Sequence, residues 1–138
     1  MDIWYADVTN AFLNSILDET VYCKFPDGFS QPGKCLRLLR ALYGLRQAPR
    51  LWQQEFVSTL KGLGLRQILE EPCLFTNDDG IFLLFYIDDI LLLSRKDRSR
   101  QARSIQNALL QTYDMKDLGE LKWFLGLQII RDRSQCIL

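Results

Sequence analysis

The sequence predicts an α+β protein, in which a mostly antiparallel sheet carries two helices packed on one face. Short segments with alternating or continuous apolar residues are interspersed with two segments of helical period, and turn residues separate them. The 138 residues, 48% of them hydrophobic, suffice for one domain with its own core. No internal repeat, linker or low-complexity segment interrupts this pattern.

The first half of the chain is predicted to contain three strands and one helix. Residues 3–8 (IWYADV) alternate as a strand that ends at Asp7. Residues 21–25 form a short strand closed by the turn residues 26–28 (PDG), and residues 34–42 form a third strand. Residues 47–63 place apolar side chains at helical spacing and end near two glycines, which predicts a helix.

The second half is predicted to contain four strands and a second helix. Glu71-Pro72 predicts a break in the chain, and residues 77–80 (NDDG) predict a turn. A tight hairpin is expected to place Asp88-Asp89 at its tip, because apolar segments flank this pair on both sides. The predicted strands are 73–76, 81–87, 90–94 and 122–130, and the predicted helix is 98–113.

The aspartate pair is unusual because eleven of the fourteen residues in the window 81–94 are apolar. Two carboxylates about 4 Å apart repel by roughly 4 kcal/mol at an effective dielectric constant near 20. A positive partner is therefore expected nearby. The alternative is that Asp88 and Asp89 are ordinary turn residues, although Asn-Gly or Asp-Gly suits a two-residue hairpin turn better.

Asp7 supplies a third carboxylate at the end of an apolar-alternating strand, and three carboxylates can form a metal site. The chain contains no histidine, which excludes His-based triads and His-ligated zinc. Oxygen ligands alone suit Mg²⁺ or Mn²⁺, and paired ions of this kind catalyse in-line displacement at phosphorus. The residues thus indicate phosphoryl or nucleotidyl transfer.

Charge, hydrophobicity and cysteine spacing indicate the partners, location and cysteine state of the protein. The net charge is zero, but basic residues gather in 34–50 and in 95–103. Each basic cluster is either a solvated face or a nucleic-acid contact. The longest apolar runs are too short to span a bilayer and no signal-peptide pattern precedes them, so a soluble intracellular protein is expected. The cysteines are far apart and are expected to be reduced thiols in the core: Cys23, Cys35, Cys73 and Cys136.

Four segments in order resemble the reverse transcriptase of copia-type LTR retrotransposons over nearly the whole chain. ADVTNAFLNSILDETVY resembles the first catalytic segment of that family, and KCLRLLRALYGLRQAPRLW resembles its template- and nucleotide-contacting segment. FYIDDILLL resembles the YxDD hairpin, and DLGELKWFLGLQI resembles the closing segment. The resemblance implies that residues 1–138 are a partial polymerase palm domain, with fingers and thumb largely absent.

The resemblance implies a role for each matching residue. Asp7 and Asp88 would bind two Mg²⁺ ions, with Mn²⁺ as a substitute, while Asp89 assists and the carbonyl of Val8 adds an oxygen ligand. Two-metal transfer of deoxynucleotides to a primer 3′-hydroxyl follows from this set. Phe12 would act as a steric gate against the ribose 2′-hydroxyl, although ordinary core packing is the alternative.

The remaining implied contacts are with nucleotide and nucleic acid. Gln47, with Arg46 and Arg50 nearby to meet phosphate, would contact the incoming nucleotide or the template; alternatively, Gln47 satisfies backbone amides at a helix N-terminus. Ala48 stands where retroviral relatives have glycine, which questions the fine geometry of that loop. The other implied contacts, for which core packing is the alternative, are Tyr86 at the primer end and a primer grip made by Trp123, Phe124, Leu125 and Gly126.

The implied partners are an RNA or DNA template with its primer, deoxynucleoside triphosphates, and the remaining polyprotein regions: fingers, thumb, RNase H and integrase. No membrane is implied, and the implied location is the cytoplasm, including virus-like particles. Two other classes stay open: a catalytically inactive nucleic-acid-binding remnant, and a structural fragment that keeps only the fold. A metal-dependent nuclease is a weaker alternative.

Overall fold

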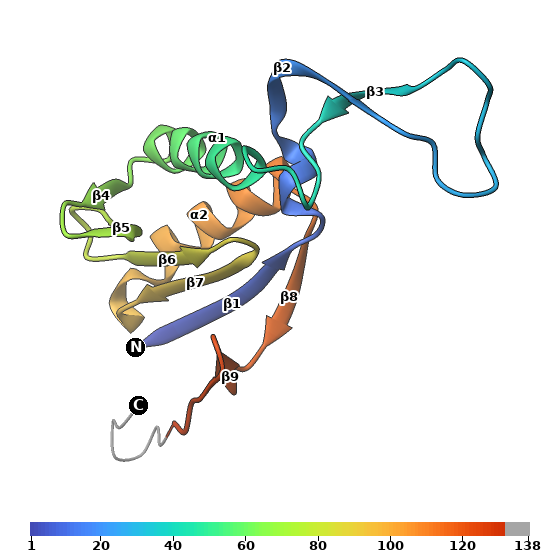
Figure 1. Ribbon diagram of the computed structural model, residues 1–138. Coiled ribbons are helices and arrows are strands. Elements are labelled where there is room, and N and C mark those ends of the chain that lie inside the picture. The colour runs from blue at the N-terminus through green and yellow to red at the C-terminus, as the bar shows by residue number, and fades with distance from the viewer. Residues whose placement is uncertain (132–138) are drawn as a thin grey trace. The chain divides into compact units, whose positions relative to one another are not determined.

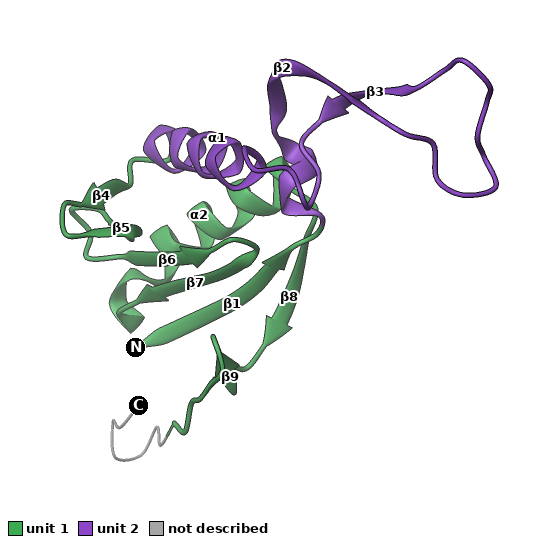
Figure 2. Cartoon of the chain, viewed as in Figure 1, with its two compact units in different colours: residues 1–9, 63–138 green, residues 10–62 purple. Residues whose placement is uncertain are grey.

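A computed structural model describes residues 1–131, which form parts of two compact units (Figure 2). Unit 1 consists of residues 1–9 and the chain from residue 63 onward, and unit 2 consists of residues 10–62. The sheet that carries Asp7 and Asp89 of the predicted site belongs to unit 1. The assignment of all 138 residues to one palm domain stays a prediction.

Unit 1 is built on a six-stranded sheet in which every neighbouring pair is antiparallel. The strands, in spatial order, are β4 (Arg66–Ile68), β5 (Glu71–Thr76), β6 (Phe82–Tyr86), β7 (Asp89–Ser94), β1 (Asp2–Val8) and β8 (Met115–Gly119). Strand β1, from the start of the chain, lies between β7 and β8, which come from the second half of the chain (Figure 1).

Period-two alternation sorts the side chains of β1 onto two faces. Trp4, Ala6 and Val8 are buried on one face. Helix α2 (Ser99–Thr112) packs on this face against β7, and its buried residues are Ala102, Ile105 and Leu109. The spacing of these three residues is that of one helix face, which explains why the segment folds as an amphipathic helix. We call this side of the sheet the helix face.

The opposite side of the sheet, here called the open face, carries Ile3, Tyr5 and Asp7 of β1. A short hairpin of β9 (Trp123–Phe124) and β10 (Leu127–Gln128) contributes to an apolar cluster on this face. The cluster consists of buried Leu91, Leu121 and Phe124, with Ile3, Tyr5, Leu84, Leu93 and Ile129 packed against them. The apolar part of the open face is thus covered by the β9–β10 hairpin, whereas Asp7 and Asp89 lie at its polar end.

Unit 2 contains a two-stranded antiparallel sheet, one 3-10 turn and one helix. The strands are β2 (Ile16–Cys23) and β3 (Leu36–Arg40). The 3-10 turn η1 (Ala11–Asn14) contacts both β3 and helix α1 (Ala48–Gly62), and α1 also contacts β2. Helix α1 buries Trp52 and Phe56, whose ring centroids lie 5.1 Å apart.

The structure confirms the α+β class, with antiparallel sheets and two helices, and corrects several predicted elements. Glu71-Pro72 does not break the chain, because both residues belong to β5. The predicted strand 122–130 is a hairpin of two-residue strands, since Leu125 and Gly126 form a turn with positive φ values of 49° and 81°. Strands β4 and β8 were not predicted, because short polar segments such as RQI and MKDLG lack an apolar alternation.

The three cysteines among the described residues are free thiols, as predicted, but do not lie in the core. Cys23 and Cys73 are partly buried, Cys35 is exposed, and all three are free thiols. Cys136 lies outside the described residues. Across residues 1–131, no helix is both long and apolar enough to cross a membrane.

Candidate active site

The candidate site is a row of side chains that crosses four strands on the open face of the sheet. Asp7 of β1 is the register partner of Asp89 on β7, and Asp89 is in turn the partner of Tyr86 on β6. On the other side of β1, Asp7 is the partner of Lys116 on β8. Because register partners point to the same face, Tyr86, Asp89, Asp7 and Lys116 form one line. We call this line the carboxylate row.

Asp88 joins the row through the backbone. The Val8 amide donates a hydrogen bond to the Asp88 carbonyl at 2.8 Å, which ties the end of β1 to the β6–β7 hairpin. Residue 7 therefore lies next to the hairpin, as predicted, and both belong to unit 1. Asp7, Asp88 and Asp89 are all partly buried.

The carboxylates repel one another, as the aspartate pair predicted. Burial, followed by the negative charges of Asp88 and Asp89, raises the pKa of Asp7, and only Lys116 acts in the opposite direction. The Tyr5 hydroxyl donates a 2.7 Å hydrogen bond to Oδ1 of Asp89. Burial, that hydrogen bond and the surrounding carboxylates raise the pKa of Tyr5 to about 12, so the phenol keeps its proton and remains a donor.

The hairpin tip differs from the prediction. The turn consists of Ile87 and Asp88, whereas Asp89 is the first residue of β7 and pairs with Tyr86. A positive φ at the first turn residue alone is the pattern of a type II′ turn, in which glycine is favoured at that position. Ile87 has a φ of 57° there, which is a strained conformation for a β-branched residue. Tertiary context therefore overrides the turn preference and moves Asp89 into the sheet.

Three of the predicted contact residues, Phe12, Gln47 and Arg50, lie in unit 2 and already have partners there. Phe12 is buried in η1, with its ring centroid 4.2 Å from that of Tyr43. Gln47 donates from Nε2 to Oε1 of Glu19 at 2.8 Å, which differs from the helix-capping alternative for this side chain. Arg50 forms an exposed ion pair with Asp18 at 2.5 Å, and its hydrogen bond holds the pKa of Asp18 below the usual value.

Arg46 and the predicted primer-grip segment are placed differently. Arg46 is exposed just before α1. In the β9–β10 hairpin of unit 1, Phe124 is buried in the open-face cluster and meets Tyr5 edge-on at 6.2 Å, whereas Trp123 is 58% exposed. Phe124 therefore packs as core. Trp123 and Leu125 remain accessible to a ligand.

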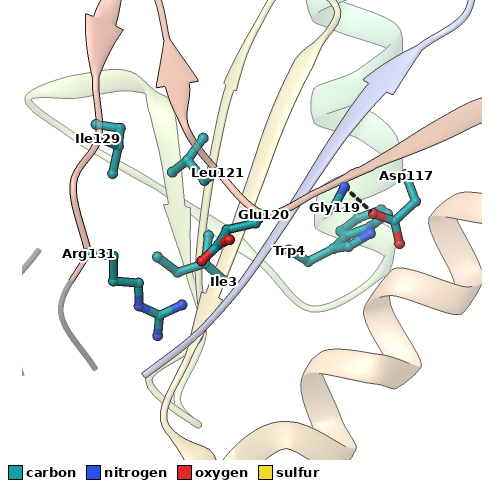
Figure 3. Close-up of a pocket in the computed structure, with 8 residues that line it drawn as sticks. All are labelled: Ile3, Trp4, Asp117, Gly119, Glu120, Leu121, Ile129 and Arg131. Carbon is teal, nitrogen blue, oxygen red and sulfur yellow. Dashed lines mark hydrogen bonds between the residues drawn. The ribbon is translucent and has the colours of Figure 1, made fainter. Parts of the chain in front are cut away.

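A cavity of about 270 Å³ lies next to Trp4 rather than at the carboxylate row (Figure 3). It opens beside the part of β1 that β8 leaves unpaired, since β8 pairs only with residues 5–8. Figure 3 shows Asp117 beside the Trp4 ring, where its Oδ1 accepts a 2.8 Å hydrogen bond from the Gly119 amide. The lining residues contain no predicted site residue; they are Ile3, Trp4, Asp117, Gly119, Glu120, Leu121, Ile129 and Arg131.

The donor chemistry of the carboxylate row suits a hard divalent cation. All three acids offer oxygen ligands, and burial, followed by the charges of Asp88 and Asp89, raises the pKa of Asp7. As positioned, however, no group of three or more His, Cys, Asp or Glu residues between positions 1 and 131 is gathered closely enough to hold a metal ion. The residue types fit the ion, whereas the metal-ligand assignment stays a prediction.

Two members of the site were missed in the sequence. Tyr5 could have been found, because it lies two residues before Asp7 in an alternating strand and so shares its face. Lys116 could not, since its strand was not predicted and only the β1–β8 register places it opposite Asp7. It is a positive group opposite Asp7, whereas no ion pair among the described residues joins a cation to Asp88 or Asp89.

Comparison with known proteins identifies the family. All of residues 1–138 match the family described as "Reverse transcriptase (RNA-dependent DNA polymerase)". The chain belongs to this reverse transcriptase family.

Its relatives are proteins of retrotransposons, which confirms the copia-type resemblance. The chain is 36% identical to the "Retrovirus-related Pol polyprotein from transposon TNT 1-94" of Nicotiana tabacum, over 97% of the chain and 10% of that polyprotein. It is 38% identical to a putative transposon Ty5-1 protein of Saccharomyces cerevisiae, over 89% of the chain and 41% of that protein. A third relative, the Pol polyprotein from transposon RE1 of Arabidopsis thaliana, is 37% identical over 91% of the chain and 9% of its own length. The chain thus spans about a tenth of the two Pol polyproteins and less than half of the Ty5-1 protein.

Proposed function

We propose that this chain is the palm portion of an RNA-directed DNA polymerase, which transfers deoxynucleotides to the 3′-hydroxyl of a primer. The observation that carries the proposal is the carboxylate row, in which Asp7 and Asp89 face each other across two central strands and the backbone of Asp88 is bonded to Val8. The family match supports the same activity.

In the carboxylate row, the aspartates carry negative charge and Lys116 offsets part of it. Asp7 and Asp88 would be the principal ligands of two Mg²⁺ ions, with Asp89 and the Val8 carbonyl assisting. When bound, such ions lower the pKa of the attacking hydroxyl and neutralise the leaving pyrophosphate. Tyr5 orients Asp89 through its hydrogen bond, and Lys116 limits the repulsion at Asp7. The antiparallel sheet keeps these groups in place, so little reorganisation is needed during the reaction.

The remaining assignments concern nucleotide and primer. Phe12 would exclude the ribose 2′-hydroxyl, and Gln47 with Arg46 would contact the incoming nucleotide. Gln47 and Arg50 would have to exchange Glu19 and Asp18 for nucleic acid, which is feasible because the Arg50–Asp18 pair is about half exposed. The accessible contacts to the primer would come from Arg50, Tyr86, Trp123 and the Leu125-Gly126 turn.

The test is dNTP incorporation on a primed RNA template in the presence of Mg²⁺. Asp88→Asn should abolish incorporation, because it removes a ligand charge while keeping the side-chain volume. Asp27→Asn, which removes a charge from the exposed turn after β2, is the matched control and should leave incorporation unchanged. Equal incorporation by wild type and Asp88→Asn would remove the catalytic assignment.

A catalytically inactive nucleic-acid-binding remnant is the second candidate. It is favoured by the basic clusters at residues 34–50 and 95–103, which could contact phosphate whether or not the carboxylates bind a metal ion. A remnant should bind primer–template with a steep salt dependence but show no Mg²⁺-dependent incorporation. A structural fragment should show neither property.

A further inference from the structure

The exposed face of α2 carries basic residues that are not part of the proposed polymerase site. Arg100, Arg103, Ser104 and Asn107 are all exposed, and their spacing of three, four and seven residues places them on one stripe of the helix. Together with Ser99 they line an open hollow of about 650 Å³. We call this hollow the α2 groove. Each of its five side chains can donate a hydrogen bond, and none is apolar or acidic.

The positive charge of the α2 groove is not neutralised from within the helix. Helix α2 contains no acidic residue, and none of the ion pairs found among the described residues involves Arg100 or Arg103. Positive charges near a helix N-terminus are also unfavourable for the helix dipole, and the first turn of α2 has no acid to offset them. The folded chain therefore keeps two cations where its own structure gives them little stabilisation.

The neighbouring acids are mostly engaged with other groups. Arg98 bonds Asp79 at 3.3 Å and lies 3.9 Å from Asp97. Asp2 accepts a 2.6 Å hydrogen bond from Ser99, which is the main cause of its lowered pKa. Asp2 also lines a cavity with Arg103, but among the described residues no ion pair joins it to Arg100 or Arg103.

We propose that the α2 groove binds the phosphate backbone of a nucleic-acid strand. Arginine, serine and asparagine side chains are typical phosphate contacts, and arginine can bind a phosphate with two parallel hydrogen bonds. Residues 100 to 107 extend about 10 Å along the helix axis at 1.5 Å per residue. That length corresponds to about three phosphates of one strand at 3.4 Å each along a duplex. An acidic protein would be a poorer fit, because the groove has no apolar anchor such as protein interfaces place at their centre.

The α2 groove and the carboxylate row lie on opposite sides of the sheet. A second, smaller cavity joins Arg103 and Ala102 of α2 to Trp4 and Leu92, which belong to the helix face. Asp7 and Asp89 point to the open face. A strand in the α2 groove is therefore a different stretch of nucleic acid from one whose end reaches the carboxylates. The proposal holds whether or not the carboxylate row is catalytic.

The test is equilibrium binding of a short, fluorescently labelled, unstructured RNA to the full chain, measured by anisotropy over a series of salt concentrations. Arg100→Gln/Arg103→Gln should weaken binding and reduce the slope of log affinity against log salt by about 1.4, since each single-strand phosphate contact contributes about 0.7. Lys24→Gln/Lys61→Gln removes the same charge from exposed positions outside the groove and is the matched control. Circular dichroism of each variant verifies that α2 is intact.

Three outcomes would overturn the proposal. One is an unchanged salt slope in the folded groove variant. Another is an equal loss of slope in the control variant, which would mean that net charge alone drives binding. The third is tighter, groove-dependent binding of poly-glutamate than of RNA, which would make the partner an acidic protein. DNA of the same sequence should bind as tightly as RNA. A photo-crosslinking residue placed at Ser104 should crosslink to the labelled RNA or DNA even when primer–template is also bound.

Discussion

The carboxylate of Asp7 is expected to destabilise the folded chain, so Asp7→Asn should raise the free energy of unfolding at pH 7. Asp7 faces Asp89 directly in the antiparallel register, where side chains lie about 5 Å apart at Cβ and like charges cost roughly 0.2–1 kcal/mol. Asp88 adds a second repulsion and burial a desolvation cost, whereas Lys116 offsets part of the total. The expected net gain is about 1 kcal/mol, or about 3 °C in the melting temperature for a chain of this size.

The pH dependence of this gain gives a second check. Because the pKa of Asp7 is raised in the folded state, the folded chain holds that proton more tightly than the unfolded chain does. The cost of the carboxylate is therefore present above the raised pKa and disappears as the pH falls below the unfolded value of about 3.9. Wild type and Asp7→Asn should differ in stability at pH 7 and converge in acid.

Urea unfolding followed by tryptophan fluorescence measures both effects, with Asp27→Asn as the control for removal of one negative charge. A ligand that binds only the folded state stabilises it, so Mg²⁺ should stabilise wild type more than Asp7→Asn. Lower stability of Asp7→Asn at pH 7 would refute the reasoning, because it would show that the carboxylate makes favourable contacts that outweigh the repulsion.

Three further predictions concern the scaffold. Leu125→Asn should stabilise the chain by about 1 kcal/mol, since asparagine tolerates the positive φ of a type I′ turn better than leucine; a lower urea midpoint would contradict this. Phe56→Ala should destabilise it by roughly 3–5 kcal/mol, because the ring is fully buried; a loss below that range in the same urea experiment would mean that the site collapses around the smaller side chain. Iodoacetamide should alkylate Cys35 before Cys73 at neutral pH, as peptide mass mapping can show, because burial and Glu71 raise the pKa of Cys73 and keep it as the thiol; the reverse order would contradict the burial seen here.

Much of the fold could be predicted because its signals are local. Alternation in IWYADV identified β1 to within one residue at its start, and helical spacing identified both helices to within one residue at each end. The turn at residues 77–80 is also present, with the Gly80 amide bonded to the Asn77 carbonyl. Strand β8 was missed because its pairing with β1, rather than its own residues, makes it a strand.

Some residues of the candidate site could likewise be predicted from the sequence, and others could not. Asp7, Asp88 and Asp89 were predicted because charge within apolar sequence is a local anomaly, and Tyr5 follows from the period of its strand. The place of Lys116 opposite Asp7 could not be predicted. Nor could the finding that Asp88 lies in the hairpin turn whereas Asp89 belongs to strand β7. Both depend on strand register, which is decided by contacts between distant segments.

By itself, the sequence determined both helices, the strands with an apolar pattern and the segments that carry acid or base, since period, turn chemistry and charge are read from neighbouring residues. Only the tertiary structure decided that Asp7 faces both Asp89 and Lys116, and that the α2 groove lies on the other side of the sheet. The physical reason is that a shift of one residue in strand pairing would turn each of these side chains to the opposite face.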